Sequence, residues 1–147
     1  MGDVSSVWVA AFTDLDASTL YGLLRLRVDV FVVEQRCSYR ELDGRDTEPS
    51  TQHLWTADST GPTAYLRVLA EPSGWRIGRV CTRRNARGAG LAGRLMDAAV
   101  HLTGDAPVVL DAQSPLAGWY ERFGFTVCGA PFLEDGIPHV PMARPGG

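Results

Sequence analysis

Cysteine is scarce in this sequence, and its positions are scattered. The 147 residues include three cysteines, Cys37, Cys81 and Cys128, and none of them forms a CxxC motif. An odd, scattered set argues against a disulfide framework and favours reduced thiols, which are typical of a cytoplasmic protein. No His or Cys pair has metal-ligand spacing, so we expect no metal site.

Long hydrophobic runs and an excess of positive charge are also absent. No stretch reaches the roughly 18 to 20 apolar residues that cross a bilayer, and Met1–Ser6 lacks the basic and apolar parts of a secretory signal. The net charge is −3, whereas nucleic-acid-binding domains usually carry a basic excess. We therefore expect neither a membrane nor a nucleic acid as a partner.

What remains is the composition of an ordinary globular protein. Hydrophobic residues make up 45% of the chain and charged residues 21%, within the usual range. The length is enough to bury one core, and no repeat or long linker divides it. We predict a single domain over residues 1–147, in which 145–147 form a loose C-terminal tail.

Hydrophobic periodicity predicts alternating strands and helices. Helices are expected over 17–31, with Asp16 as the N-cap, over 89–102, and over 115–123, where Ser114 and Pro115 favour the start and Gly124 the end. Residues 37–50 are polar and acidic and are predicted to form a loop with at most a short helical turn. Strands are expected over 7–12, 53–58, 63–70, 75–82, 108–110, 125–128 and 138–143.

The order of these elements predicts an α/β (α+β) fold. Successive strands in the first half can pair antiparallel, whereas the strand-helix-strand unit over 75–111 requires a parallel pair with a right-handed crossover. The expected result is a mixed, mostly antiparallel sheet of about seven strands with about four helices.

The sharpest local feature is the turn Arg87-Gly88-Ala89-Gly90-Leu91-Ala92, between a predicted strand and a predicted helix. Glycine and alanine let a ligand approach the backbone closely. Unsatisfied amides and the helix dipole favour an anion at a helix start. The turn therefore predicts a phosphate or pyrophosphate site. Positive charge surrounds it, from Arg83, Arg84, Arg87 and Arg94.

A dinucleotide site is an alternative explanation of the same glycines. Gly88-x-Gly90-x-x-Gly93 also fits GxGxxG, and Asp111 follows at about the expected distance of 20 residues. Against this, residues 83–87 separate the glycines from the preceding strand. Too little chain follows Asp111 to complete a doubly wound sheet.

Two segments and the predicted strand order resemble those of the GNAT acetyltransferases. Arg87-x-x-Gly90-x-Ala92 fits the family's Q/R-x-x-G-x-G/A signature, and the run 119–125 (WYERFGF) resembles its Y-E-x-x-G-F segment. The predicted strand order also matches the family's along nearly the whole chain. A closer resemblance, to the ElaA-like subfamily, rests on the runs 26–35 (LRVDVFVVEQ), 39–46 (YRELDGRD) and 134–139 (EDGIPH).

The resemblance implies that acetyl-coenzyme A is the cosubstrate and an amine the acceptor. In the family, the turn holds the coenzyme A pyrophosphate, which implies this role for Arg87, Gly88, Ala89, Gly90, Leu91 and Ala92. The preceding strand carries the pantetheine arm, which implies contacts with Val80, Cys81 and Thr82. Gln113, at the end of a short strand, is a further candidate for the pantetheine amides or, alternatively, a cap.

Amine acetylation needs a base for the ammonium and an acid for the departing thiolate. By resemblance, Tyr120 is that acid, and its phenol keeps its proton at pH 7; helical spacing alone also fits a core aromatic. For the base we name Glu34, whose partial burial is expected to raise its pKa, and His53. A water relay is equally open, as are the other candidates Glu41, Asp43, Glu134 and His139.

We therefore predict an N-acetyltransferase that works by direct transfer in a ternary complex, without an acetyl-Cys81 intermediate. The acceptor is a small molecule, a peptide or a protein, and the acidic run with Glu41, Asp43 and Asp46 could attract it if it is cationic. The alternative is a non-catalytic acyl-coenzyme A sensor. Exposed sheet edges make a homodimer plausible.

Overall fold

The computed structural model describes residues 6–38 and 40–147 of the chain. Its strands form one sheet in the order β1-β2-β3-β4-β5-β8-β6, and β7 pairs with β8 beside β6. β4 and β5 are parallel, and the other pairs are antiparallel. The mixed sheet is as predicted, with eight strands: β1 (Trp8–Ala11), β2 (Gln52–Asp58), β3 (Gly61–Glu71), β4 (Gly74–Thr82), β5 (Val108–Gln113), β6 (Thr126–Val127), β7 (Phe132–Glu134) and β8 (Ile137–Arg144).

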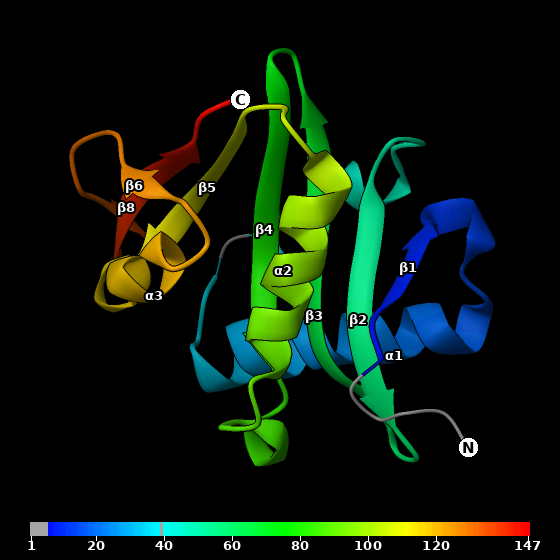
Figure 1. Ribbon diagram of the computed structural model, residues 1–147. Coiled ribbons are helices and arrows are strands. Elements are labelled where there is room, and N and C mark those ends of the chain that lie inside the picture. The colour runs from blue at the N-terminus through cyan, green and yellow to red at the C-terminus, as the bar shows by residue number, and fades with distance from the viewer. Residues whose placement is uncertain (1–5, 39) are drawn as a thin grey trace.

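The helices α1 (Ala17–Arg27) and α2 (Leu91–Thr103) cover opposite faces of this sheet, and α3 (Ala117–Glu121) lies beside β5 (Figure 1). Alternation along β3 explains the two layers, because successive strand residues point to opposite faces. Tyr65 packs in the cluster of α1, with Leu23 and Leu26. Its neighbour Leu66 packs in the cluster of α2, with Leu95 and Met96.

The helix predicted over 17–31 changes character at Val28. It begins as predicted at Asp16, whose carboxylate accepts a hydrogen bond of 2.7 Å from the Thr19 N–H. After Arg27 the chain continues as a π-helix over Val28–Glu34. The wider turn carries the helical run past its predicted end, and such segments are frequent at functional sites.

The third predicted helix is shorter than expected. Ser114–Leu116 is a 3-10 turn, and its N-cap is Gln113 rather than Ser114. α3 then ends before Gly124, which has the left-handed φ of 92° that the sequence predicts. At the C-terminus, the Gly147 N–H donates to the Asp105 carbonyl at 3.0 Å, so the tail that we predicted to be loose is tied at its end.

Buried charge holds the predicted acidic loop against the sheet. Arg27, at the end of α1, is 1% exposed, and it donates to Glu41 at 2.8 Å and to Asp46 at 2.7 Å. On β3, Arg67 pairs with Asp43 and Asp46. We call this set the arginine–carboxylate cluster; its six members are Arg27, Arg67, Arg79, Glu41, Asp43 and Asp46.

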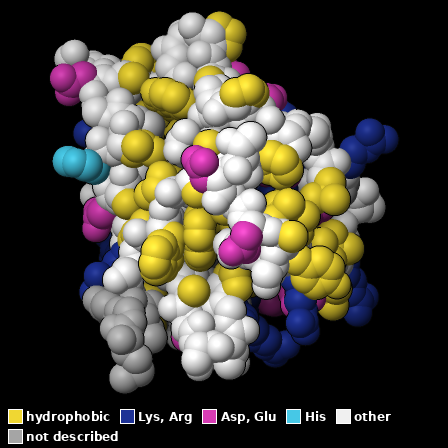
Figure 2. Space-filling view, turned by 90° about the vertical axis from the view of Figure 1, so that its right-hand side faces the viewer, with side chains coloured by type: hydrophobic (Ala, Val, Ile, Leu, Met, Phe, Trp, Pro, Cys, Tyr) yellow, Lys and Arg dark blue, Asp and Glu magenta, His cyan; other side chains and the backbone are white. Residues whose placement is uncertain are grey.

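The edge of the sheet at β1 faces solvent. Figure 2 views the molecule from this side, and hydrophobic side chains gather there. Trp8 and Val9 of β1 are 54% and 47% exposed. An apolar edge strand can pair with a second copy, so the homodimer remains a prediction. In the part of the chain that the structure describes, no helix has the length and apolar character to cross a membrane.

We predict that Arg27→Ala lowers the free energy of unfolding by about 3–5 kcal/mol, because each of two buried carboxylates, Glu41 and Asp46, loses one of its two arginine partners. Urea unfolding followed by circular dichroism would measure this loss. The matched control is Arg25→Ala on the same helix, whose exposed ion pair with Asp29 spans 3.9 Å; a pair of that kind is worth at most about 1 kcal/mol. Equal losses in the two variants would contradict a structural role for the cluster.

Candidate active site

The parallel strands β4 and β5 separate after two residue pairs. Trp75 pairs with Val108 and Arg76 with Val109, after which β4 continues to Thr82 while β5 turns toward α3 (Figure 1). The backbone N–H and C=O groups on that side of β4 thus lack a partner in β5. Such groups need water or a ligand.

A bulge in β4 lies beside this divergence. Tyr65 of β3 pairs with Cys81, and Arg67 pairs with Gly78, so Arg79 and Val80 together face one β3 residue. Arg79 has a φ of 55°, which is rare for a residue with a side chain. Its side chain reaches Glu41 at 3.0 Å, and this contact of the arginine–carboxylate cluster accompanies the bulged backbone.

The first of two pockets, here the glycine-turn pocket, has a volume of about 740 Å³. Gly88 and Gly90 have φ values of 85° and 76°, and a Cβ added to either would meet no atom within 4 Å. α2 starts at Leu91 without a side-chain cap, so its first amides are open to an anion. The turn fits a pyrophosphate. Five apolar side chains also line the pocket and could contact an extended arm: Val30, Val80, Leu116, Trp119 and Phe123.

Arg87 is already paired in this pocket. Its guanidinium donates to both carboxylate oxygens of Glu34, at 2.7 and 2.8 Å, and to the Thr82 carbonyl at 3.1 Å. The ion pair joins the π-helix to the glycine turn. It also means that an anion in the pocket meets the Glu34 charge as well as the Arg87 charge.

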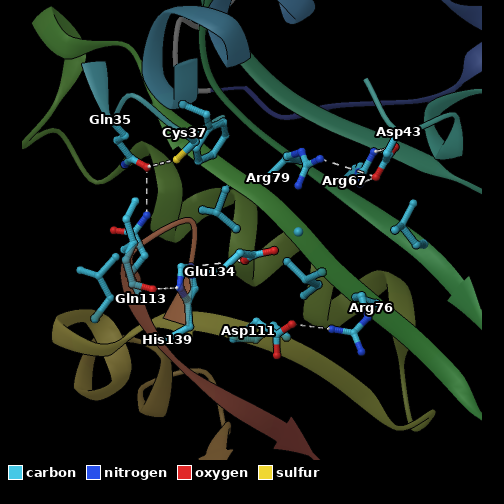
Figure 3. A pocket seen from close by; sticks show the side chains of 18 of the residues that line it. Gln35, Cys37, Asp43, Arg67, Arg76, Arg79, Asp111, Gln113, Glu134 and His139 are labelled. Atoms are coloured by element: carbon cyan, nitrogen blue, oxygen red, sulfur yellow. Dashed lines mark hydrogen bonds and ion pairs between the residues drawn. The ribbon is translucent and has the colours of Figure 1, made fainter. Parts of the chain in front are cut away.

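The second pocket, here the hairpin pocket, lies between β4, β5 and the β7–β8 hairpin and has a volume of about 350 Å³ (Figure 3). One wall carries arginines that are paired with carboxylates: Arg67 with Asp43 at 2.9 Å and Arg76 with Asp111 at 3.2 Å. The opposite wall carries neutral and acidic groups, namely Gln35, Gln113, Glu134 and His139.

The two pockets meet at four residues that line both of them: Gln35, Val80, Leu116 and Tyr120. Tyr120 is 6% exposed, and the ring of Trp119 packs edge-on against it at 4.9 Å between centroids. Burial raises the pKa of Tyr120 to about 12, so its hydroxyl stays protonated at neutral pH. A buried proton donor therefore stands where a ligand in one pocket can meet a ligand in the other.

Comparison with known proteins identifies the family. Residues 22–144 match the acetyltransferase (GNAT) domain. The chain belongs to the GNAT acetyltransferase family. It is 53% identical to a UPF0039 protein of Mycobacterium tuberculosis over 138 residues, which cover 90% of this chain and 88% of that protein.

Solved structures of GNAT proteins agree with this result. An acyl-CoA N-acyltransferase from Pseudomonas aeruginosa superimposes with a TM-score of 0.88 and 42% identity, over 95% of this chain and 98% of that one. Escherichia coli ElaA superimposes with the same score over the same shares, with 36% identity. In sequence, ElaA is 39% identical over 141 residues. The predicted ElaA-like family is confirmed, and acyl transfer is its general activity.

The observed sheet excludes the alternative of a dinucleotide-binding fold. A doubly wound sheet has mostly parallel strands, whereas the GNAT sheet of this chain contains the single parallel pair β4–β5 among its described strands. Asp111, which would have bound a ribose, pairs instead with Arg76 in the hairpin pocket.

Most of the predicted coenzyme contacts lie together in the glycine-turn pocket of this GNAT domain. Ala89 is the exception in the turn, since it does not line the pocket. Gln113 lines the hairpin pocket together with Val80 and donates to Gln35 at 3.1 Å, so its contact with the pantetheine amides stays a prediction. The eight residues that do line the glycine-turn pocket are Val80, Cys81, Thr82, Arg87, Gly88, Gly90, Leu91 and Ala92.

His53 lies in the interior and lines neither pocket. Its Nδ1 accepts from the Tyr65 hydroxyl at 2.6 Å, and its Nε2 donates to the Asp46 carbonyl at 3.0 Å. Burial lowers the pKa of His53 and keeps it neutral. With both ring nitrogens occupied and 1% exposure, it cannot accept a proton from an acceptor, and the prediction of a catalytic His53 is not supported.

The expected rise in the pKa of Glu34 is wrong. Hydrogen bonds from Arg87 lower the pKa of Glu34 instead, because the charged partner outweighs slight burial. A carboxylate held by an arginine is a weak base. The sequence could not show this, since Arg87 lies far along the chain.

The acidic loop does not present free charge to an acceptor. Glu41 and Asp46 are buried, and each of the three predicted carboxylates is paired with arginine. The partners Arg27, Arg67 and Arg79 were not predicted as part of the site. Arg67 and Arg79 lie within predicted strands, and an arginine buried in a sheet usually has a charged partner. This was the signal in the sequence that could have indicated the ion pairs. Among the described residues, no cluster of three or more His, Cys, Asp or Glu side chains could hold a metal.

We predict that Cys81 resists alkylation. Burial raises the pKa of its thiol to about 12, so at about pH 8 almost none is thiolate, the reactive form. Iodoacetamide followed by peptide mass spectrometry should label the exposed Cys128 and leave Cys81 unmodified in the folded protein. Labelling of both at similar rates would reopen a route through Cys81.

Proposed function

We propose that this GNAT protein transfers the acetyl group of acetyl-coenzyme A to an amine in a ternary complex. The observation that supports it most directly is the position of Tyr120 in the common wall of the two pockets. Coenzyme A would occupy the glycine-turn pocket, and the acceptor would enter the hairpin pocket. The reacting groups would then meet beside a proton donor.

The chain's own residues account for binding and for one proton transfer. The amides of the glycine turn would bind the pyrophosphate, and the open backbone of Val80–Thr82 the amide-bearing arm. When the C–S bond breaks, the thiolate takes a proton from the Tyr120 hydroxyl, which its raised pKa of about 12 keeps protonated until that moment. Direct transfer also agrees with the raised thiol pKa of Cys81.

Tyr120→Phe should lower kcat by about 100-fold, a typical effect for a lost general acid. The ring is retained, so the affinity for acetyl-coenzyme A, measured by calorimetry, should stay within about twofold. Equal losses in turnover and affinity would show that Tyr120 is structural. Binding with no transfer to any amine in the wild type would favour a sensor. The chain contains no lysine, since its 14 basic residues of the Lys and Arg types are all arginines. Acetylation of the protein's own lysines therefore cannot confound the assay.

Glu34→Gln and Arg87→Ala should change coenzyme affinity in opposite directions. Removing the Glu34 charge leaves Arg87 unneutralised, so calorimetry should show about twofold to fivefold tighter binding of acetyl-coenzyme A, the scale of one exposed ion pair. Arg87→Ala leaves Glu34 facing the pyrophosphate and should weaken binding by about fivefold. The control is Arg25→Ala, on the outer side of α1.

Glu34→Gln also tests whether Glu34 is the general base. If it is not, Glu34→Gln should retain kcat within about threefold. A fall of about 100-fold at unchanged coenzyme affinity would restore Glu34 as the general base.

A further inference from the structure

The β7–β8 hairpin forms one wall of the hairpin pocket and is fixed at its tip. Asp135 and Gly136 have φ values of 52° and 79°, the left-handed pair typical of a two-residue hairpin turn. The Asp135 carboxylate accepts from the backbone N–H and, at 2.5 Å, from the hydroxyl of Ser38. This joins the hairpin to the chain just after the π-helix, so its inward side chains are held over the pocket.

His139 is one of these side chains, and its orientation assigns its tautomer. Its Nδ1 lies 2.7 Å from the Ile137 carbonyl. A carbonyl only accepts, so Nδ1 carries the hydrogen, and Nε2 of the neutral ring bears a lone pair. The ring stacks on Phe132 at 5.7 Å and is 9% exposed. Nε2 faces the Glu134 carboxylate at 3.7 Å (Figure 3).

Glu134 differs from the other acids of the pocket. Asp43 and Asp111 are held by arginines, whereas Glu134, half exposed, has no arginine within ion-pair distance among the described residues. Its charge is therefore available to a cation. The charged groups that line the pocket with His139 are Asp43, Arg45, Arg67, Arg76, Arg79, Asp111 and Glu134, and Glu134 is the one that faces the imidazole.

The size of the pocket limits the acceptor. A volume of about 350 Å³ is at the lower end of the range for small-molecule sites, roughly 300–1,000 Å³. Walls from β4, β5 and the hairpin surround it (Figure 3). This suits a small aliphatic amine better than an extended polypeptide.

Resting on the proposed acetyl transfer, we infer that His139 is its general base and that Glu134 receives the ammonium group of a small aliphatic amine. The ammonium gives one proton to His139 Nε2, and the freed nitrogen bonds to the acetyl carbon. The C–S bond then breaks, and sulfur leaves with its electron pair. The thiolate takes the Tyr120 proton, the phenolate recovers one from the acetylated nitrogen, and the imidazolium releases its proton to solvent.

The test compares His139→Gln with His101→Gln, a control at the exposed end of α2. The substrates are n-butylamine and a lysine-containing peptide, and each acetylated product is measured by mass spectrometry. Near pH 7, His139→Gln should lower kcat/KM for n-butylamine by about 100-fold, with unchanged affinity for acetyl-coenzyme A. The deficit should shrink as the pH approaches the amine's own pKa, about 10 to 11, where free amine needs no base.

Glu134→Gln should act on binding. The KM for n-butylamine should rise by about fivefold, the scale of one exposed charge pair, with a smaller change in kcat. Asp14→Asn, an exposed carboxylate that does not line the pocket, is the control and should change neither. Melting temperatures would show that all variants fold.

The outcomes separate this inference from the proposed function. Acetylation of n-butylamine with a pH-independent deficit in His139→Gln, or with none, overturns the base while leaving acetyl transfer intact. A clear preference for the peptide overturns the small acceptor. Binding of acetyl-coenzyme A with no amine acetylated by the wild type overturns the proposed function and the base with it.

Discussion

The arginine–carboxylate cluster is the constraint on which the site depends. Burying charge costs several kcal/mol per ion, and the pairing does little more than offset that cost. What the cluster supplies is position: Glu41 accepts from Arg27 of α1 and from Arg79 of β4 at 2.8 and 3.0 Å. One carboxylate thus ties a helix to the bulged strand. The acidic loop becomes part of the pocket wall rather than a mobile acidic surface.

The divergence of β4 and β5 creates the space that this wall borders. If the two strands stayed paired along their length, all backbone groups of β4 would be hydrogen-bonded and no pocket could form between the strands. Because pairing stops at Arg76, the strand backbone is available on one side, and a pocket opens on each side of Tyr120. Burial of that side chain and its raised pKa follow from the same packing against Trp119.

Local pattern predicted the parts of the fold that are locally determined. The long strands, α2, the Asp16 cap and the glycine turn follow from periodicity and turn chemistry. Strand β7 has three residues, too few for the alternation of hydrophobic and polar residues that predicts a strand. The Asp135-Gly136 pair that follows it is nevertheless a recognisable hairpin-turn sequence. The π-helix and the cluster could not be predicted, because both depend on partners distant in sequence. The predicted rise in the pKa of Glu34 was wrong for the same reason, whereas the role of Tyr120 was proposed through resemblance.

The hairpin pocket shows why the residues of a site must be considered with their partners. By composition, its lining has four arginines and three acids, which would favour an anionic acceptor. The ion pairs reverse this, since each arginine is held by carboxylates of the lining or of the layer behind it. A new anion would have to displace a carboxylate that already pairs with the arginine, at the cost of that ion pair. A cation has no such cost at Glu134, so the pairing, not the count, favours an amine.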